Sequence, residues 1–144
     1  MRRIFLFLLI SLFCFNINAK WVEAARSDME ITYINTNMTY DEEGTFYLTV
    51  KVVPLKNMLQ KRRKEYIDLF QSSRYKKYTH SVNQWRVDFT NNMIMIIGGT
   101  DYANNDVLTV TNMMEGETKW LPVRYNTVGS EVIRVARIMV ENSK

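Results

Sequence analysis

The chain has 144 residues, of which 47% are hydrophobic and 24% charged, and its formal net charge is +4. This length suits one domain, and so small a net charge does not indicate a class of partner. Cys14 is the only cysteine and lies in a segment that we expect to be removed. The mature chain can therefore form neither a disulfide nor a thiolate-bound zinc or iron–sulfur site.

Residues 1–19 have the three parts of a secretory signal peptide. Two arginines precede the apolar run Ile4–Phe15, and a short polar stretch then ends at Ala19. The run is about 12 residues long, whereas a helix needs roughly 20 to cross a bilayer, which argues against a membrane anchor. The large Phe13 before Cys14 argues against a lipoprotein signal. We expect cleavage after Ala19, export, and no transmembrane segment in the remainder.

Three strands are predicted next, at Trp21–Ala25, Glu30–Asn35 and Thr45–Val53. The third has the clearest period of two, and Pro54 ends it because proline cannot donate to the ladder. The apolar residues of this strand fall on one face: Phe46, Leu48, Val50 and Val52. The polar stretch between the second and third strands predicts a loop.

Residues 55–72 change to a helical period. The apolar stripe comprises Leu55, Met58, Leu59, Tyr66, Leu69 and Phe70. Arg62 interrupts this stripe, and we expect its aliphatic stem to lie along the apolar surface. A basic connector, residues 72–78, follows the helix.

A β-meander is predicted over residues 84–108. Asparagine tolerates the left-handed region, so the Asn91–Asn92 and Asn104–Asn105 pairs predict turns. A glycine pair, Gly98–Gly99, predicts a bulge or bend before Tyr102. The strands of the meander are residues 85–89, 93–97 and 107–110. The middle strand is apolar on both faces, which is typical of a strand covered on both sides.

Residues 120–123 predict another extended segment, and Ser130 is a suitable N-cap for a last helix. The apolar face of that helix comprises Val132, Val135, Ala136, Met139 and Val140. The predicted fold is α+β. An antiparallel sheet of about six strands is covered by the C-terminal helix, and an additional basic helix lies between strands.

No catalytic or metal constellation is recognised. His80 is the only histidine and has no motif around it, so we do not expect it to act as a catalytic base. The stretch Asp101–Asp106 lacks the glycine and glutamate that an EF-hand calcium loop requires, so we interpret it as a turn. The sequence therefore predicts a protein that is not an enzyme and needs no cofactor.

Residues 56–77 form the most basic part of the chain, with eight lysines and arginines against two acidic residues. This segment predicts a surface for acidic glycans, anionic lipid head groups or acidic segments of a host protein. A solvated helix face is the alternative, and nucleic acid is not expected for an exported chain. The candidate partner-binding residues are Lys61, Arg62, Arg63, Lys64, Tyr66, Arg74, Tyr75, Lys76 and Lys77.

Several residues and short segments serve as landmarks, and their order along the chain resembles that of a known family. These landmarks are Trp21, Tyr33–Asn35, Gly44, Phe46–Val53, Val87–Phe89, Tyr102, Thr118–Val123 and Gly129–Ser130. This order resembles the surface-adhesin protein E family of Gram-negative bacteria. The resemblance covers nearly all of Trp21–Val140, and it implies that residues 20–144 form a single adhesin E-like domain. It also implies an antiparallel sheet with a packed C-terminal helix.

One departure from the family concerns a cysteine pair that its members often carry. The corresponding positions are near Phe89 and at Ala136–Arg137, where this chain has no cysteine. We expect apolar packing to replace the bridge.

The function that the resemblance implies is an exported, non-enzymatic surface adhesin that contacts host extracellular-matrix components. The alternative is a periplasmic module that binds a small apolar ligand or a partner in the envelope. The soft, adaptable side chains of Met93, Met95, Met113 and Met114 would suit the lining of such a ligand site. The sequence leaves open whether the domain lies on the cell surface or in the periplasm.

Overall fold

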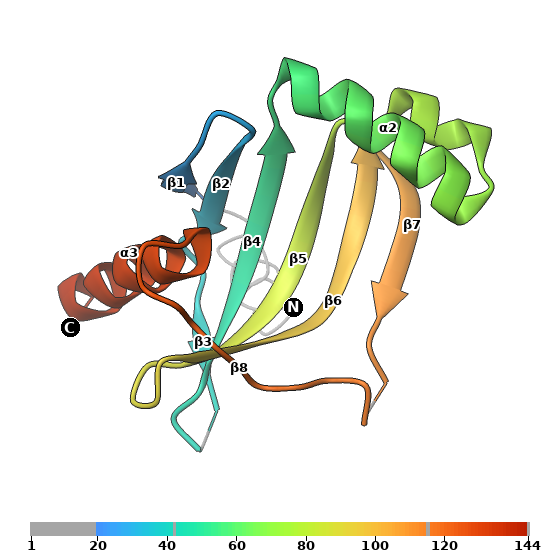
Figure 1. The fold of residues 1–144 in the computed structure, drawn as a ribbon. Helices are drawn as coiled ribbons and strands as arrows, with labels where there is room; N and C mark the ends of the chain where they lie inside the picture. The colour runs from blue at the N-terminus through green and yellow to red at the C-terminus, as the bar shows by residue number, and fades with distance from the viewer. Residues whose placement is uncertain (1–19, 42, 115, 144) are drawn as a thin grey trace, which may run out of the picture.

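Antiparallel strands make up most of the computed structural model, which describes residues 20–41, 43–114 and 116–143. The predicted signal peptide lies outside the described residues. Six strands pair in the order β1-β2-β4-β5-β6-β7, while β3 pairs with β4 and β8 with β6 (Figure 1). The strands are β1 Trp21–Arg26, β2 Glu30–Asn35, β3 Thr39–Tyr40, β4 Phe46–Pro54, β5 His80–Asp88, β6 Met93–Ala103, β7 Asp106–Asn112 and β8 Leu121–Pro122.

The helical segments among the described residues are α2 Lys56–Phe70, the short 3-10 helix η1 Ser73–Lys77, and α3 Val128–Asn142. In Figure 1, α3 lies beside β1 and β2, whereas α2 runs along the opposite end of the sheet, across the ends of β4 to β7. Alternation along β2 puts Glu30, which contacts α2, on the same face as Ile34, which belongs to the core beneath α3. The α+β prediction is confirmed, and both helices cover one face of the sheet.

The α3 half of this face forms the apolar core. Its buried residues are Ala24, Ile34, Leu48, Val50, Trp85, Val87, Val132, Ile133 and Ala136. The strand residues come from four neighbouring strands and lie on the face that the period of two predicts for β4. The predicted apolar face of α3 is correct, although the stripe extends to Ile133 as well.

The N-terminus of α3 differs from the prediction. The N-cap is Thr127, and Ser130 occupies the third helical position rather than the cap. The side chain of each of these two residues bonds the backbone N–H of the other, forming a capping box. The sequence pattern placed the cap one turn too late because both residues are good hydrogen-bonding partners for a helix end.

Beneath α2 and η1 the same face is aromatic and polar. The segment predicted as a connector contains η1, whose Tyr75 is buried together with the following Tyr78. No residue of α2 itself is fully buried, and Leu69 of its predicted apolar stripe is 70% exposed. The helix is therefore held through η1 and a few directed contacts more than through an apolar stripe of its own.

The predicted β-meander is confirmed as β5, β6 and β7. Asn92 and Asn104 adopt positive φ in the two turns. Register shifts fall on both sides of the glycine pair, one opposite Gln84–Trp85 and one at Asp101–Tyr102. Both glycines sit where strands approach closely, since a Cβ on Gly98 would lie 2.8 Å from the carbonyl oxygen of Thr111.

Candidate functional site

The nine candidate binding residues divide into exposed lysines and residues that hold the fold together. Lys61, Lys64, Lys76 and Lys77 are exposed on α2 and η1. Arg74 is also exposed, but its guanidinium donates to the carbonyl oxygen of Val107 at 2.9 Å. It therefore covers part of the outer backbone edge of β7.

Two arginines of α2 point toward the protein rather than away from it. Arg62 pairs with Glu30 of β2, and both side chains are mostly buried. Burial alone would lower the pKa of Arg62, but the hydrogen bond and charge of Glu30 raise it overall. Arg63 donates to the carbonyl oxygen of Tyr78 at 2.8 Å. The guanidinium of Arg62 thus has a carboxylate partner that the sequence pattern did not indicate, while the position expected for its aliphatic stem stays a prediction.

The two tyrosines among the candidates, Tyr66 and Tyr75, take part in an aromatic cluster, and Tyr75 is too deeply buried to contact a partner. Tyr75 is 1% exposed and stacks on Phe70, with ring centroids 4.9 Å apart. Tyr66 is half-buried and meets Tyr75 and Tyr78 edge-on at 5.5 and 5.2 Å. Such edge-to-face contacts stabilise an aromatic cluster. These aromatic side chains pack α2 and η1 onto the sheet. The inclusion of Tyr75 among the partner-binding residues is therefore wrong.

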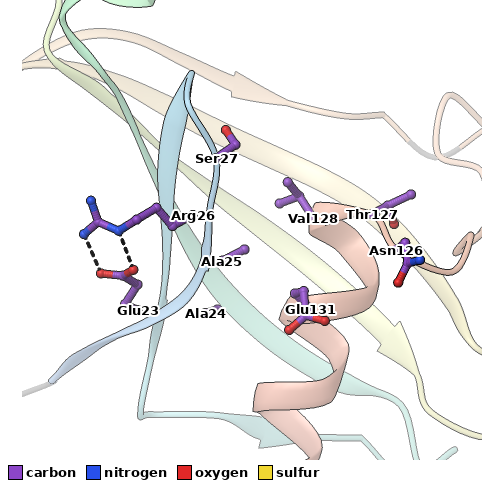
Figure 2. A pocket seen from close by; sticks show the side chains of 9 residues that line it. All are labelled: Glu23, Ala24, Ala25, Arg26, Ser27, Asn126, Thr127, Val128 and Glu131. Atoms are coloured by element: carbon purple, nitrogen blue, oxygen red, sulfur yellow. Dashed lines mark hydrogen bonds and ion pairs between the residues drawn. The ribbon is translucent and has the colours of Figure 1, made fainter.

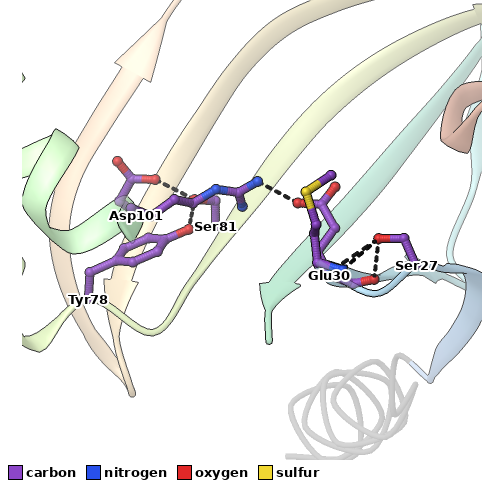
Figure 3. Close-up of polar contacts among 7 residues, drawn as sticks. Ser27, Glu30, Tyr78, Ser81 and Asp101 are labelled. Carbon is purple, nitrogen blue, oxygen red and sulfur yellow. Dashed lines mark hydrogen bonds and ion pairs between the residues drawn. The ribbon is translucent and has the colours of Figure 1, made fainter. Parts of the chain in front are cut away.

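A network of hydroxyls and one carboxylate lies under this cluster (Figure 3). The hydroxyl oxygens of Tyr78 and Ser81 are 2.7 Å apart, and Ser81 donates to Oδ1 of Asp101 at 2.6 Å. Tyr75 donates to the other oxygen, Oδ2, at 2.8 Å. Burial raises the pKa of Tyr75 to about 12, and Asp101 acts in the same direction. The network satisfies polar groups that the fold has taken from water.

Two of the exposed lysines flank a shallow groove of about 290 Å³ between α2 and η1. Lys64 and Lys76 line it from the two elements, together with Arg63. Asp68 is the one acidic residue of the lining. Gln60 and Ile67 are its uncharged members. The groove therefore brings together two lysines that are 12 positions apart in the sequence, in a site with excess positive charge.

Two further cavities lie beside α3. One, of about 560 Å³, separates β1 from the first turn of α3 (Figure 2). Glu23 and Glu131 line it, and Glu23 is paired with Arg26. The helix N-terminus would favour an anion here, but these carboxylates oppose one.

The other cavity, of about 780 Å³, lies at the C-terminal end of α3 and is mainly apolar. Met38, Tyr40, Phe46, Met139 and Val140 form its apolar lining. The methionines predicted for an apolar site do not line it: Met95 is buried within the fold and Met114 is 70% exposed. Sequence reasoning missed Met38 because it lies in an irregular segment, and it assigned Met139 only to the core.

His80 has a structural setting. Its ring stacks on that of Tyr102 at 5.0 Å, and its Nδ1 is 2.9 Å from Oγ1 of Thr79. Burial lowers the pKa of His80, with Lys51 acting in the same direction. The described residues bring no group of three histidine, cysteine or acidic side chains together in a way that could hold a metal ion.

Phe89 and Arg137, at the positions where the resemblance would imply a cysteine pair, are neighbours. The guanidinium of Arg137 lies 5.3 Å from the centre of the Phe89 ring and donates to the carbonyl oxygen of the same residue. Phe89 also packs against Phe46, with centroids 4.9 Å apart. A cation–π contact and a hydrogen bond thus join the two positions, and replacement of a bridge by apolar packing stays a prediction.

Comparisons with known proteins give no relative for this chain. No family model, curated protein or solved structure matches it. Within residues 20–41, 43–114 and 116–143, no helix combines the length and the apolar character needed to cross a membrane.

Proposed function

We propose that the chain is an exported, non-enzymatic binding protein of adhesin type, which attaches to acidic groups of host extracellular-matrix components. The single observation that carries the proposal is the groove that Lys64 and Lys76 share between α2 and η1. Lys61 lies one turn before Lys64 on α2 and is exposed, so it extends the same basic surface. Its own contact with Glu65 is long, at 3.9 Å, and leaves its charge largely available.

This proposal assigns different roles to the lysines and to the other candidate residues of the basic segment. The lysines would contact the partner, whereas the arginines and tyrosines shape the surface that presents them. Lysine suits such a role because its charge sits at the end of a flexible stem and needs no fixed geometry. The partner should therefore be an acidic surface or polymer recognised by charge, such as a sulfated glycan chain.

The test uses the double variant Lys64→Glu/Lys76→Glu on a heparin surface. A matched control reverses two exposed cations elsewhere, Lys119→Glu/Arg124→Glu, so the net charge changes equally. We expect the first variant to bind at least about tenfold more weakly, which is a loss of about 1.4 kcal/mol. Raised salt should weaken the wild type as well, because these charges are exposed. Equal losses in both variants would show attraction by net charge alone and would contradict the proposal.

Location provides a second, independent test. A tag at the C-terminus and protease treatment of intact cells would report whether the domain is accessible from outside. Digestion on intact cells agrees with adhesion. Protection until the outer membrane is opened would place the domain in the periplasm and remove the adhesin role.

An envelope protein that binds a small apolar ligand is the second candidate. The observation in its favour is the apolar cavity of about 780 Å³ at the end of α3, a volume within the range of small-molecule sites. Native mass spectrometry should then show a bound ligand on the wild type. The ligand should be lost in Met139→Lys but kept in Ile138→Lys, whose side chain is 44% exposed on the same helix. A ligand-free wild type would exclude this candidate.

A further inference from the structure

A fourth cavity, of about 300 Å³, opens on the helix-covered face of the sheet beneath α2. Its floor consists of Val52, Ser81, Asn83 and Asp101, from three adjacent strands. Glu30 borders it from β2, while Arg62 and Tyr66 border it from α2. It lies at the polar end of the face, away from the apolar core beneath α3, and neither proposed function uses it.

Part of the polar lining has its partners within the protein. Asp101 accepts from Ser81 and Tyr75, and Glu30 accepts from Arg62 through one oxygen, Oε2. These contacts fix the positions of both carboxylates. A carboxylate has about four acceptor sites, so each can accept further hydrogen bonds from a ligand. The charged groups of the lining are thus held in place before any ligand arrives.

Asn83 differs from these residues. Within the described part of the chain, no residue forms a hydrogen bond with its carboxamide, although that group lines the cavity. Its oxygen would lie only 2.4 Å from a Cβ placed on Gly99, the residue opposite it on β6. The absence of a side chain on Gly99 therefore makes room for the carboxamide. A donor and an acceptor are left facing the cavity.

The charge of the lining limits the chemistry of the ligand. One guanidinium, from Arg62, stands against two carboxylates, from Glu30 and Asp101. An anion would meet this excess of negative charge, so the acidic partner of the lysine groove is not suited to this site. A ligand with several hydroxyls fits better. Each hydroxyl can donate to a carboxylate and accept from Arg62 or Asn83.

We propose that this cavity binds one neutral sugar unit. The carboxylates, the guanidinium and the carboxamide would recognise its hydroxyls, and Val52 with the ring of Tyr66 would contact its carbon framework. The volume lies at the lower end of the range for small-molecule sites, which suits one ring rather than a chain. This inference does not depend on the lysine groove.

The experiment is a titration of the isotope-labelled protein with free neutral monosaccharides, followed by backbone amide shifts in NMR spectra. A neutral hexose or N-acetylhexosamine should shift amides around Asn83 and Asp101 and saturate in the millimolar range. Asn83→Ala should weaken this binding at least tenfold. Its control is Gln84→Ala, because Gln84 is the next residue of β5 and its side chain lies on the opposite face. That control should bind as the wild type does.

A second variant, Gly99→Ala, tests the cavity without removing a polar group. Its added methyl should displace the carboxamide of Asn83 and weaken sugar binding, and the thermal unfolding curve would show that the variant is folded. The variant Lys64→Glu/Lys76→Glu should retain sugar binding, so this inference can fail or stand independently of the proposed adhesion. The inference is overturned if no neutral sugar shifts these amides, if Asn83→Ala binds as well as the wild type, or if only a sulfated sugar or a polyamine binds.

Discussion

The two ends of the helix-covered face pack against their helices through different kinds of residue. Beneath α3 the sheet presents aliphatic side chains such as Leu48 and Val50, which meet Val132 and Ala136. Beneath α2 and η1 it presents Ser81 and Asp101, and the covering side chains are tyrosines. One sheet face thus contains an apolar half and a hydrogen-bonded half.

The difference shows what each kind of packing contributes. Apolar burial is non-directional and roughly proportional to area, so the α3 half supplies most of the stability. Hydrogen-bonded packing adds less net free energy, but it is costly to leave incomplete, so it fixes the positions of its members. The α2 half is therefore suited to holding polar groups in defined places beside a cavity.

Leu48→Ala should be the most damaging of the substitutions considered. Leu48 is 1% exposed in the apolar half, and its truncation should cost about 2–5 kcal/mol of unfolding free energy. Urea denaturation measures this loss. Leu69→Ala on α2 is the matched control and should change stability by less than about 0.5 kcal/mol, because its side chain is mostly exposed. Similar losses in the two variants would contradict the division of the face.

Tyr75→Phe tests the hydrogen-bonded half while keeping its ring packing. The change removes the hydroxyl that donates to Asp101 and lies 2.7 Å from Oγ1 of Thr109. The expected loss is about 1–3 kcal/mol, because partly buried partners lose a hydrogen bond. Chemical denaturation of this variant and of Thr109→Val, alone and together, would show whether the losses are coupled. Fully additive losses would argue against a connected network.

The same hydroxyl predicts a dependence of stability on alkaline pH. The pKa of Tyr75 is raised to about 12 in the fold, whereas an unfolded tyrosine ionises near about 10. The contribution of the neutral hydroxyl is complete below about pH 10 and is lost as the pH rises towards about 12. Denaturation midpoints across this range should fall more steeply for the wild type than for Tyr75→Phe. Parallel curves would contradict the assignment.

The smallest of these effects should come from the end of α3. Thr127→Ala removes the side chain that accepts from the backbone N–H of Ser130, and such caps contribute about 1 kcal/mol. Thr127→Ser is the control, since it keeps the hydroxyl. A loss of several kcal/mol in the alanine variant would mean that the capping box also orients α3 on the sheet. Thermal unfolding of the two variants distinguishes these cases.

The apolar half was predictable from the sequence and the hydrogen-bonded half was not. The alternation of β4 and the helical stripe of α3 extend over enough residues to specify which side faces the core. By contrast, η1 is only five residues long, so the segment shows no hydrophobic period. Three of its residues are basic, and the sequence therefore predicts an exposed segment although its tyrosine is buried. The inward direction of Arg62 depends on Glu30, which lies 32 positions earlier.

The candidate site, too, could be predicted from the sequence only in part. Composition predicted a basic surface, and four lysines are exposed as such a surface requires. The sequence could not separate these lysines from the arginines of the same segment, because that separation depends on long-range partners such as Glu30 and the carbonyl oxygens of Tyr78 and Val107. Nor could it find the polar cavity, which combines residues from β2, β4, β5, β6 and α2.

The packing of α3 against β1 and β2 has a consequence for the order in which the chain can fold. Ala24 and Ile34 share a core with Val132 and Ala136, so the first strands stay uncovered until α3 packs on them. Contacts between residues so far apart in sequence close slowly. During that interval the apolar half of the sheet is exposed to other chains and to chaperones. Packing of α3, rather than pairing of any strand, therefore completes the native structure of this face.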